Sequence, residues 1–251
     1  MCRLAAFAPG TTKKQAIDIL ENMVNDNIDG TGYAYVQNGE FVLHKYPIPL
    51  KTAIKRKQNF LSHMPHNGWT LVHLRKASVG SKIYDNCHPF ISTDNEVVGA
   101  HNGTLHNIGL LQAYLRTVSG FVSDTDSACA IELISRGGME SFVDELDWGG
   151  VFITLKKSGV LEVGKVSGDL CLHRLDDGRL IIASEFNDEK YKNITVSNGY
   201  FKFDAGGKDL LDHTIKHFPH RGPASQIWHN NQGVFNRDAI HCQQTEAYCC
   251  D

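Results

Sequence analysis

The sequence lacks the features that mark several large classes of protein. It has no apolar run near the roughly 18 residues that a membrane-spanning helix needs. It has no excess of positive charge, because 25 lysine and arginine residues against 28 aspartate and glutamate residues give a net charge of −3. That balance argues against a broad nucleic-acid-binding or anionic-membrane surface. We therefore expect no nucleic-acid partner and no membrane association.

The motifs of several enzyme classes are also missing. There is no Gly-x-Ser-x-Gly, no His-Glu-x-x-His and no Cys-x-x-Cys, which argues against the matching serine hydrolases, zinc proteases and zinc fingers. A phosphate-binding loop is matched only in part before Val166, which stands where Ser or Thr should bind magnesium. His213 and His217 share a helical spacing in a His-rich tail, but scattered histidines of this kind are not diagnostic. We expect no cofactor and no metal.

The cysteines indicate the compartment. There are seven of them, an odd number at mostly scattered positions, which fits a reducing compartment better than a disulfide framework. The apolar stretch in the first ten residues is too short for a secretory signal. We therefore expect a cytoplasmic protein.

The order of the predicted elements indicates the fold class. Helices are predicted from apolar residues at helical spacing over residues 14–25, 52–64, 108–116 and 125–135. Strands are predicted over residues 4–7, 33–36, 41–44, 69–74, 97–101, 151–155, 160–163, 170–175 and 180–183. Asn38-Gly39 is typical of a hairpin turn. Ser123 or Asp124 is expected to cap the helix predicted over residues 125–135. Mixed elements followed by a strand-rich half favour an α+β protein with antiparallel sheets.

Cys2 is the first of four features that bear on chemistry. Its small side chain makes removal of Met1 expected, which would leave a thiol and a free α-amine on one residue. A thiolate is a strong nucleophile, and an α-amine with a pKa of about 7.7–8.0 can act as a general base at neutral pH. One residue would then supply both nucleophile and base.

The other three features each have a simpler explanation when taken alone. Arg75 ends a predicted strand, where it is either a solvated side chain or a bidentate partner for a carboxylate. Asn102-Gly103 is first of all a turn signal, but an Asn amide and a Gly N–H also suit an oxyanion. Asp126 lies at a predicted helix start, and its carboxylate could also bind an ammonium group.

Together and in this order, the four features resemble the class II glutamine amidotransferases, members of the N-terminal-nucleophile hydrolase superfamily. The family pattern is Met-Cys, then His-x-Arg-x-Ala-[Ser/Thr]-x-Gly, Asn-x-His-Pro, His-Asn-Gly and Ser-[Asp/Glu]-Thr-Asp-[Ser/Thr]. This chain carries the blocks at Cys2, 73–80, 86–90, 101–103 and 123–127. The resemblance spans roughly residues 2 to 185. It implies a four-layer αββα sandwich of two antiparallel sheets, with an amidotransferase domain over residues 2–187 and a C-terminal extension over residues 188–251, packed on it or partly disordered.

The resemblance also implies roles for individual residues. Cys2 matches the nucleophile that attacks the side-chain amide of glutamine, and Asn102 and Gly103 match the oxyanion hole. Arg75 matches the residue that binds the substrate carboxylate, and Asp126 the one that binds its ammonium.

Three more residues are assigned to the substrate site by the same resemblance. His88 matches the histidine that orders the glutamine-binding loop, and Ala77 and Ser78 are expected at the substrate because they belong to the Arg75 block. His101 is expected to have a packing role. The segment Asn27–Gly32 is similar to an Asn-x-Asp-Gly-x-Gly stretch that lies near the nucleophile in the family.

The implied function is hydrolysis of glutamine through a Cys thioester, with ammonia released to an acceptor on a separate synthase or ligase. Lys76 and Val79 depart from the sugar-phosphate branch of the family, where these positions are aromatic and His. Two alternatives stay open. One is an N-terminal-nucleophile amidase for another small amide, and the other is a non-catalytic glutamine-binding module.

Overall fold

The structure is a computed structural model that describes most of the chain. The described residues are 2–23, 27–56, 60–77, 82–106, 109–119, 123, 125–145, 148–191, 194–208 and 210–212.

Two antiparallel sheets form the centre of the molecule. The seven-stranded sheet has the order β11-β9-β10-β1-β4-β2-β3, and the six-stranded sheet has the order β13-β12-β8-β7-β6-β5. The strands of the first sheet are β1 (Arg3–Phe7), β2 (Gly30–Gln37), β3 (Glu40–Tyr46), β4 (Thr70–Arg75), β9 (Cys171–Arg174), β10 (Leu180–Ala183) and β11 (Ile194–Thr195). Those of the second are β5 (Phe90–Ile91), β6 (Val97–Leu105), β7 (Trp148–Lys156), β8 (Leu161–Lys165), β12 (Gly199–Phe203) and β13 (Leu210–Asp212).

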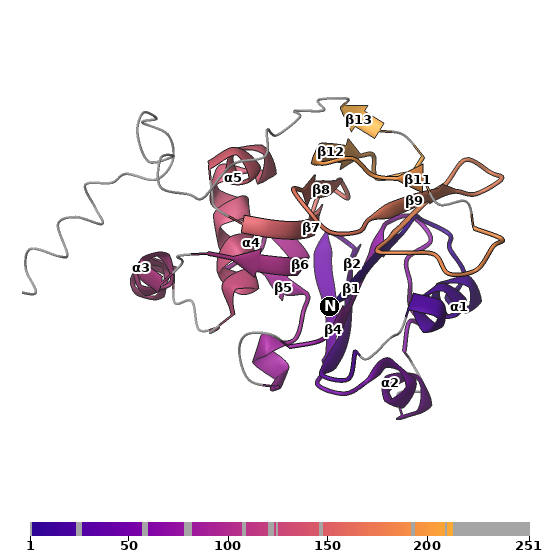
Figure 1. The fold of residues 1–251 in the computed structure, drawn as a ribbon, viewed down its shortest axis with the longest axis horizontal. Helices are drawn as coiled ribbons and strands as arrows, with labels where there is room; N and C mark the ends of the chain where they lie inside the picture. The colour runs from indigo at the N-terminus through magenta and orange to yellow at the C-terminus, as the bar shows by residue number, and fades with distance from the viewer. Residues whose placement is uncertain are drawn as a thin grey trace, which may run out of the picture.

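Helices cover the outer faces of the two sheets (Figure 1). The helices are α1 (Lys13–Met23), α2 (Leu50–Arg56), α3 (Gly109–Ser119), α4 (Asp126–Gly137) and α5 (Met139–Glu145), with one short 3-10 turn at Tyr84–Asn86. Helices α1 and α2 lie beside the seven-stranded sheet, and α4 and α5 lie on the other side of the molecule, against the six-stranded sheet. The predicted four-layer αββα sandwich is therefore confirmed. None of the described helices is long and apolar enough to cross a membrane.

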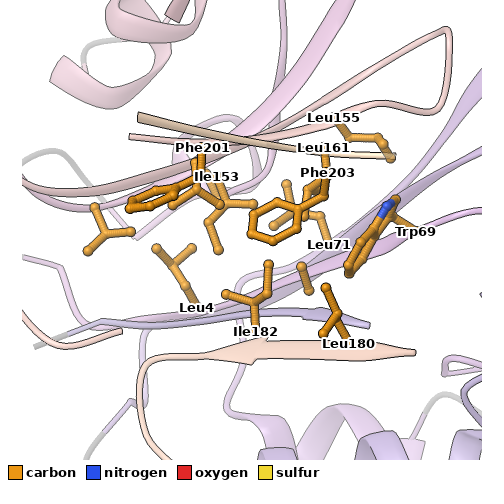
Figure 2. Close-up of a cluster of buried hydrophobic side chains, with 14 of the residues drawn as sticks. Leu4, Trp69, Leu71, Ile153, Leu155, Leu161, Leu180, Ile182, Phe201 and Phe203 are labelled. Carbon is orange, nitrogen blue, oxygen red and sulfur yellow. The ribbon is translucent and has the colours of Figure 1, made fainter. Parts of the chain in front are cut away.

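The largest apolar cluster lies between the two sheets (Figure 2). Successive side chains of a strand point to opposite faces, so one strand serves two layers. In β1, Leu4 faces the other sheet while Phe7 faces the layer beneath α1. Figure 2 shows Leu4 and Ile182 of one sheet opposite Ile153 and other apolar side chains of the other sheet.

The same alternation carries polar side chains to one end of the space between the sheets. Cys2 precedes β1 and follows the register of Leu4, which faces the other sheet. Arg75 ends β4 on the face that Leu71 occupies, four residues earlier. Asn102 in β6 follows the same rule. The strands that build the core thus also bring these three residues together.

Three details differ from the sequence predictions. The helix predicted over residues 52–64 ends at Arg56, and Leu61 has a φ of 53°, which is outside the helical region. The cap of α4 is Thr125 rather than Ser123 or Asp124, because the Thr125 side chain accepts the N–H of Ala128 at 3.3 Å. Helix α5 and strands β5, β11, β12 and β13 were not predicted. Helix α5 has only two turns, and β5, β11 and β13 have two or three residues each, too few to show a periodic pattern.

The boundary predicted at residue 187 falls between two strands of one sheet. β9 and β10 before it, and β11 after it, all belong to the seven-stranded sheet. β12 and β13 extend the other sheet. The division of the chain at 187 stays a prediction, and residues 213–251 lie outside the described residues.

Gly32 allows the segment that carries His88 to lie directly on β2. A Cβ built on Gly32 would stand 2.0 Å from the backbone oxygen of His88. Gly30, on the same strand, lies under Cys87, whose Sγ would be 2.8 Å from an added Cβ. No side chain fits at Gly32 unless the backbone at His88 moves away.

We predict that Gly32→Ala destabilises the protein by about 3 kcal/mol, because the methyl group overlaps a backbone atom that cannot rotate away. Urea unfolding measures this loss. Gly109→Ala is the matched control, since nothing lies within 4 Å of its added Cβ. Equal stability of the two variants would contradict the close packing of His88 on β2.

Candidate active site

Cys2 is held by the backbone of Lys76. The Cys2 thiol donates to the Lys76 carbonyl oxygen at 3.2 Å. The Lys76 N–H donates to Cys2 Sγ at 3.3 Å. Because β1 and β4 are antiparallel with Arg3 opposite Leu74, Cys2 necessarily reaches the residues that follow β4. The thiol is therefore fixed by two backbone groups of one residue.

The surroundings of Cys2 act on its acidity in opposite directions. Burial has the largest effect and raises the pKa of the Cys2 thiol above its ordinary value, with a smaller contribution in the same direction from Asp126. The Lys76 N–H and the charge of Arg75 favour the thiolate and partly offset burial. The thiol is protonated at neutral pH, so a nucleophilic Cys2 needs a base.

Asn102 and Gly103 approach Cys2 from the six-stranded sheet. The side-chain amide of Asn102 donates to the backbone oxygen of Cys2 at 2.8 Å. Gly103 lies opposite Gly150 on β7, and a Cβ on Gly103 would stand 1.9 Å from the Gly149 oxygen. Only glycine fits at this position, where β6 is paired with β7. The backbone of Gly103 lines the same cavity as the Cys2 thiol.

Arg75 and Asp126 are two buried charged side chains that line the same cavity. Arg75 is 3% exposed and Asp126 is 8% exposed. The Asp126 carboxylate begins α4 and accepts the backbone N–H groups of Leu105 and Ser127, both at 2.8 Å. A carboxylate in the first turn of a helix is favoured by the helix dipole. Asp126 is thereby fixed in place at the cavity wall.

Three neutral histidines lie at the site: His88 and His101 line the cavity, and His73 packs on His88. His73 and His88 have ring centroids 4.0 Å apart, and neither nitrogen of buried His88 has a hydrogen bond within the described part of the chain. Burial lowers the pKa of His73 to about 3 and that of His101 to about 4, and it lowers the pKa of His88 well below its usual value. The His101 ring stacks on that of Phe152 with ring centroids 3.9 Å apart, but His101 also lines the cavity, so its packing role stays a prediction.

Six of the eight predicted site residues line one cavity. They are Cys2, Arg75, Ala77, His88, Gly103 and Asp126. Asn102 touches Cys2 directly, and Ser78 lies outside the described residues. The cavity measures about 20 Å³, which is room for about one water molecule. A substrate of amino-acid size enters only when this lining moves.

Two contributors were not assigned from the sequence. Lys76 holds the thiol through its backbone, which leaves no signal in the identity of a side chain. Asp29 accepts the Ala77 N–H at 2.8 Å beside the site. Its motif, Asn27–Gly32, was noted as lying near the nucleophile, but its contact was not foreseen.

Among the described residues, no group of three or more His, Cys, Asp or Glu side chains is placed to hold a metal ion. His213 and His217, the pair with helical spacing, lie outside the described part of the chain.

A family model for glutamine amidotransferases of class II matches residues 18–147, just over half of the chain. The chain belongs to the class II glutamine amidotransferases. Among curated relatives, an uncharacterised protein of Methanocaldococcus jannaschii is 31% identical over 109 residues, 42% of this chain and 30% of that protein. The glutamine–fructose-6-phosphate aminotransferase of Lactiplantibacillus plantarum is 30% identical over 131 residues, 50% of this chain and 21% of that enzyme. This amidotransferase chain thus matches less than a third of either relative.

Solved structures show the same fold. The glutamine phosphoribosylpyrophosphate amidotransferase of B. subtilis is 20% identical with a TM-score of 0.67, over 84% of this chain and 48% of that one. A glutamine aminotransferase class-II domain protein from Silicibacter pomeroyi is 14% identical with a TM-score of 0.55, over 84% of this chain and 99% of that one. At these identities the likeness establishes the fold of this amidotransferase and leaves its substrate open.

We predict that the free energy of unfolding falls as the pH is lowered from about 6.5 to about 4. The buried histidines stay neutral in the folded state, while the unfolded chain takes up protons below its histidine pKa of about 6.5. Each such histidine should contribute a slope of about 1.4 kcal/mol per pH unit. Urea unfolding at several pH values measures the slope.

The variant His88→Asn should remove about one histidine's share of this slope. His66→Asn replaces an exposed histidine and should leave the slope as it is. The same slope in His88→Asn and the native chain would mean that His88 is already protonated when folded, contrary to its buried position.

Proposed function

We propose that this protein hydrolyses the side-chain amide of glutamine, with Cys2 as the nucleophile. The observation that carries the proposal is the shared cavity of Cys2, Arg75 and Asp126. A thiol flanked by one buried cation and one buried carboxylate suits an α-amino acid whose side chain ends in a carbonyl group. Arg75 would pair with the substrate carboxylate and Asp126 with its ammonium group.

The base is proposed to be the α-amine of Cys2 itself, exposed when Met1 is removed. Burial keeps the thiol protonated at neutral pH. An α-amine has a pKa of about 7.7–8.0 and lies on the same residue as the thiol. It therefore has both the position and the basicity to take the proton.

The steps balance without a further reactant except water. The α-amine takes the thiol proton, and Sγ bonds to the amide carbon to give a tetrahedral oxyanion. The carbon–nitrogen bond then breaks, and the nitrogen leaves as ammonia with the proton returned by the α-ammonium. Water attacks the thioester, which releases glutamate and restores the thiol.

Asn102 and Gly103 are proposed to stabilise the oxyanion. The Asn102 amide already lies within 2.8 Å of the Cys2 backbone, so its donor group is beside the nucleophile. The Gly103 backbone lines the same cavity. Donors fixed in place before the reaction stabilise charge that develops only in the transition state.

His88 and the Arg75 segment are proposed to shape the glutamine site. His88 lines the cavity, and neither of its buried ring nitrogens has a hydrogen bond to a described residue. Ala77 lines the cavity as well, and Ser78 follows it in sequence. We assign all three to substrate binding.

We further propose that the ammonia passes to a synthase or ligase on a separate protein. The matched relative from L. plantarum combines glutamine with fructose 6-phosphate in its name, and this chain matches 21% of it. The acceptor would therefore be bound outside the matched segment.

A reducing compartment such as the cytoplasm suits this chemistry, because the four described cysteines are free thiols.

The test is the intact mass of the purified protein before and after 6-diazo-5-oxonorleucine, an electrophilic analogue of glutamine. We expect a chain without Met1 that gains one adduct, and no adduct in Cys2→Ala. Ammonia release should follow with glutamine and be much slower with asparagine or simple acyl amides. A processed chain that gains no adduct would contradict glutamine hydrolysis and favour another amide or a binding role.

We predict that Asn102→Ala lowers kcat by about 10²–10³ and changes KM little, because an oxyanion donor acts mainly in the transition state. Steady-state ammonia release measures both constants. Asn22→Ala is the matched control, since its amide also donates to a backbone carbonyl, that of Asp18, at 2.9 Å. A change confined to KM would refute the assignment of Asn102 to the oxyanion.

A further inference from the structure

Asp29 contacts the chain on both sides of Lys76. Its carboxylate Oδ2 accepts the N–H of Ala77 at 2.8 Å. Its own backbone N–H donates to the carbonyl oxygen of Arg75 at 3.2 Å. Its Oδ1 pairs with Lys82 Nζ at 2.5 Å. Asp29 is 6% exposed, so these are contacts of a buried residue.

The two peptide groups held by Asp29 are the two that hold Cys2. The peptide between Arg75 and Lys76 offers its oxygen to Asp29 and its N–H to Cys2 Sγ. The peptide between Lys76 and Ala77 offers its N–H to Asp29 and its oxygen to the Cys2 thiol. The oxygen and the N–H of a trans peptide point in opposite directions. Both peptide planes therefore lie between Asp29 and Cys2.

We propose that Asp29 is a positioning residue for the nucleophile: it fixes the two peptide groups of Lys76 at the distances from which they hold Cys2 Sγ. Asp29 makes no bond to the thiol and is not itself one of the residues that line the cavity. Its action passes through the peptides. The inference rests on the proposed function only in treating Cys2 as the nucleophile.

The charge of Asp29 strengthens this contact. Burial opposes its ionisation, but the bonds from Lys82 and Ala77 and the nearby charge of Arg75 outweigh burial and lower the pKa of Asp29. A charged acceptor binds an N–H more strongly than a neutral one. An Asn at this position keeps the shape and one acceptor oxygen but loses the charge and the pairing with Lys82.

The experiment measures alkylation of Cys2 by iodoacetamide in the full chain between about pH 7 and pH 11, read from the chymotryptic peptide that ends at Phe7. The variants are Asp29→Asn and Asp29→Ala. With the Lys76 N–H displaced, the thiolate loses a donor, so the pH midpoint should rise by about one unit in Asp29→Ala. That shift corresponds to roughly a tenfold slower reaction at pH 7.5. The pH midpoint of Asp29→Asn should lie between those of the native chain and Asp29→Ala.

Glu132→Gln is the matched control. Glu132 is also a buried carboxylate, 2% exposed, that accepts a backbone N–H, from Thr93 at 2.8 Å, and pairs with a cation, Arg136, at 2.7 Å. It holds the segment after β5 rather than the Lys76 peptides. Its alkylation profile should match that of the native chain, although its thermal unfolding temperature falls. Arg75 and Asp126, the charged side chains beside Cys2, are unchanged in every variant.

A profile in both Asp29 variants like that of Glu132→Gln would overturn the inference, whatever their stability. Asp29→Asn decides the question if Asp29→Ala does not fold. Alkylation needs no glutamine, so the two proposals fail separately. A shifted profile in a protein that takes no 6-diazo-5-oxonorleucine adduct would support the role of Asp29 and reject glutamine hydrolysis. An adduct with an unshifted profile would do the reverse.

Discussion

The candidate active site depends on β1 being a central strand. A residue near the start of a chain is ordinarily poorly ordered, yet a nucleophile must be held within a fraction of an ångström. β1 pairs with β4 on one side and with β10 on the other, so every residue from Arg3 to Phe7 is held in the sheet. Cys2 inherits this order, and its two bonds to Lys76 continue the β1–β4 contact by one residue.

A second constraint is the close backbone contact at two positions, Gly32 and Gly103, where a side chain would not fit. Gly32 lets the backbone of His88 rest on β2, and Gly103 lets β6 lie against the Gly149 oxygen on β7. At these two close contacts, the His88 segment and strands of both sheets come together at one small cavity. Gly32 and Gly103 thus contribute by having no side chain at these two close contacts.

The sequence predicted most strands of the fold, because alternation of apolar and polar residues is a local signal, but it did not predict β5, β11, β12 and β13. It also placed Cys2, Arg75 and Asp126 in one site through the resemblance. It did not predict the part played by Lys76, because backbone groups do the work and any residue has them. The contact of Asp29 with Ala77 was equally hidden, since it joins residues 48 apart and depends on how β2 meets β4. The sequence offered several neighbouring residues as the cap of α4, and the backbone geometry decides for Thr125, whose hydroxyl lies near the Ala128 N–H.

The balance of buried charge explains how such a closed cavity would select its substrate. Arg75 lies among two carboxylates, Asp29 and Asp126, and Asp29 is already engaged by Ala77 and Lys82. Opening a cavity of about 20 Å³ to admit an amino acid breaks packing that the apolar part of a small ligand does not replace. In the proposed function, the pairing of the substrate's carboxylate with Arg75 and of its ammonium group with Asp126 offsets the loss of this packing. An analogue without its ammonium would leave the Asp126 carboxylate unpaired in a buried site, and this cost is larger than any loss of methylene contacts.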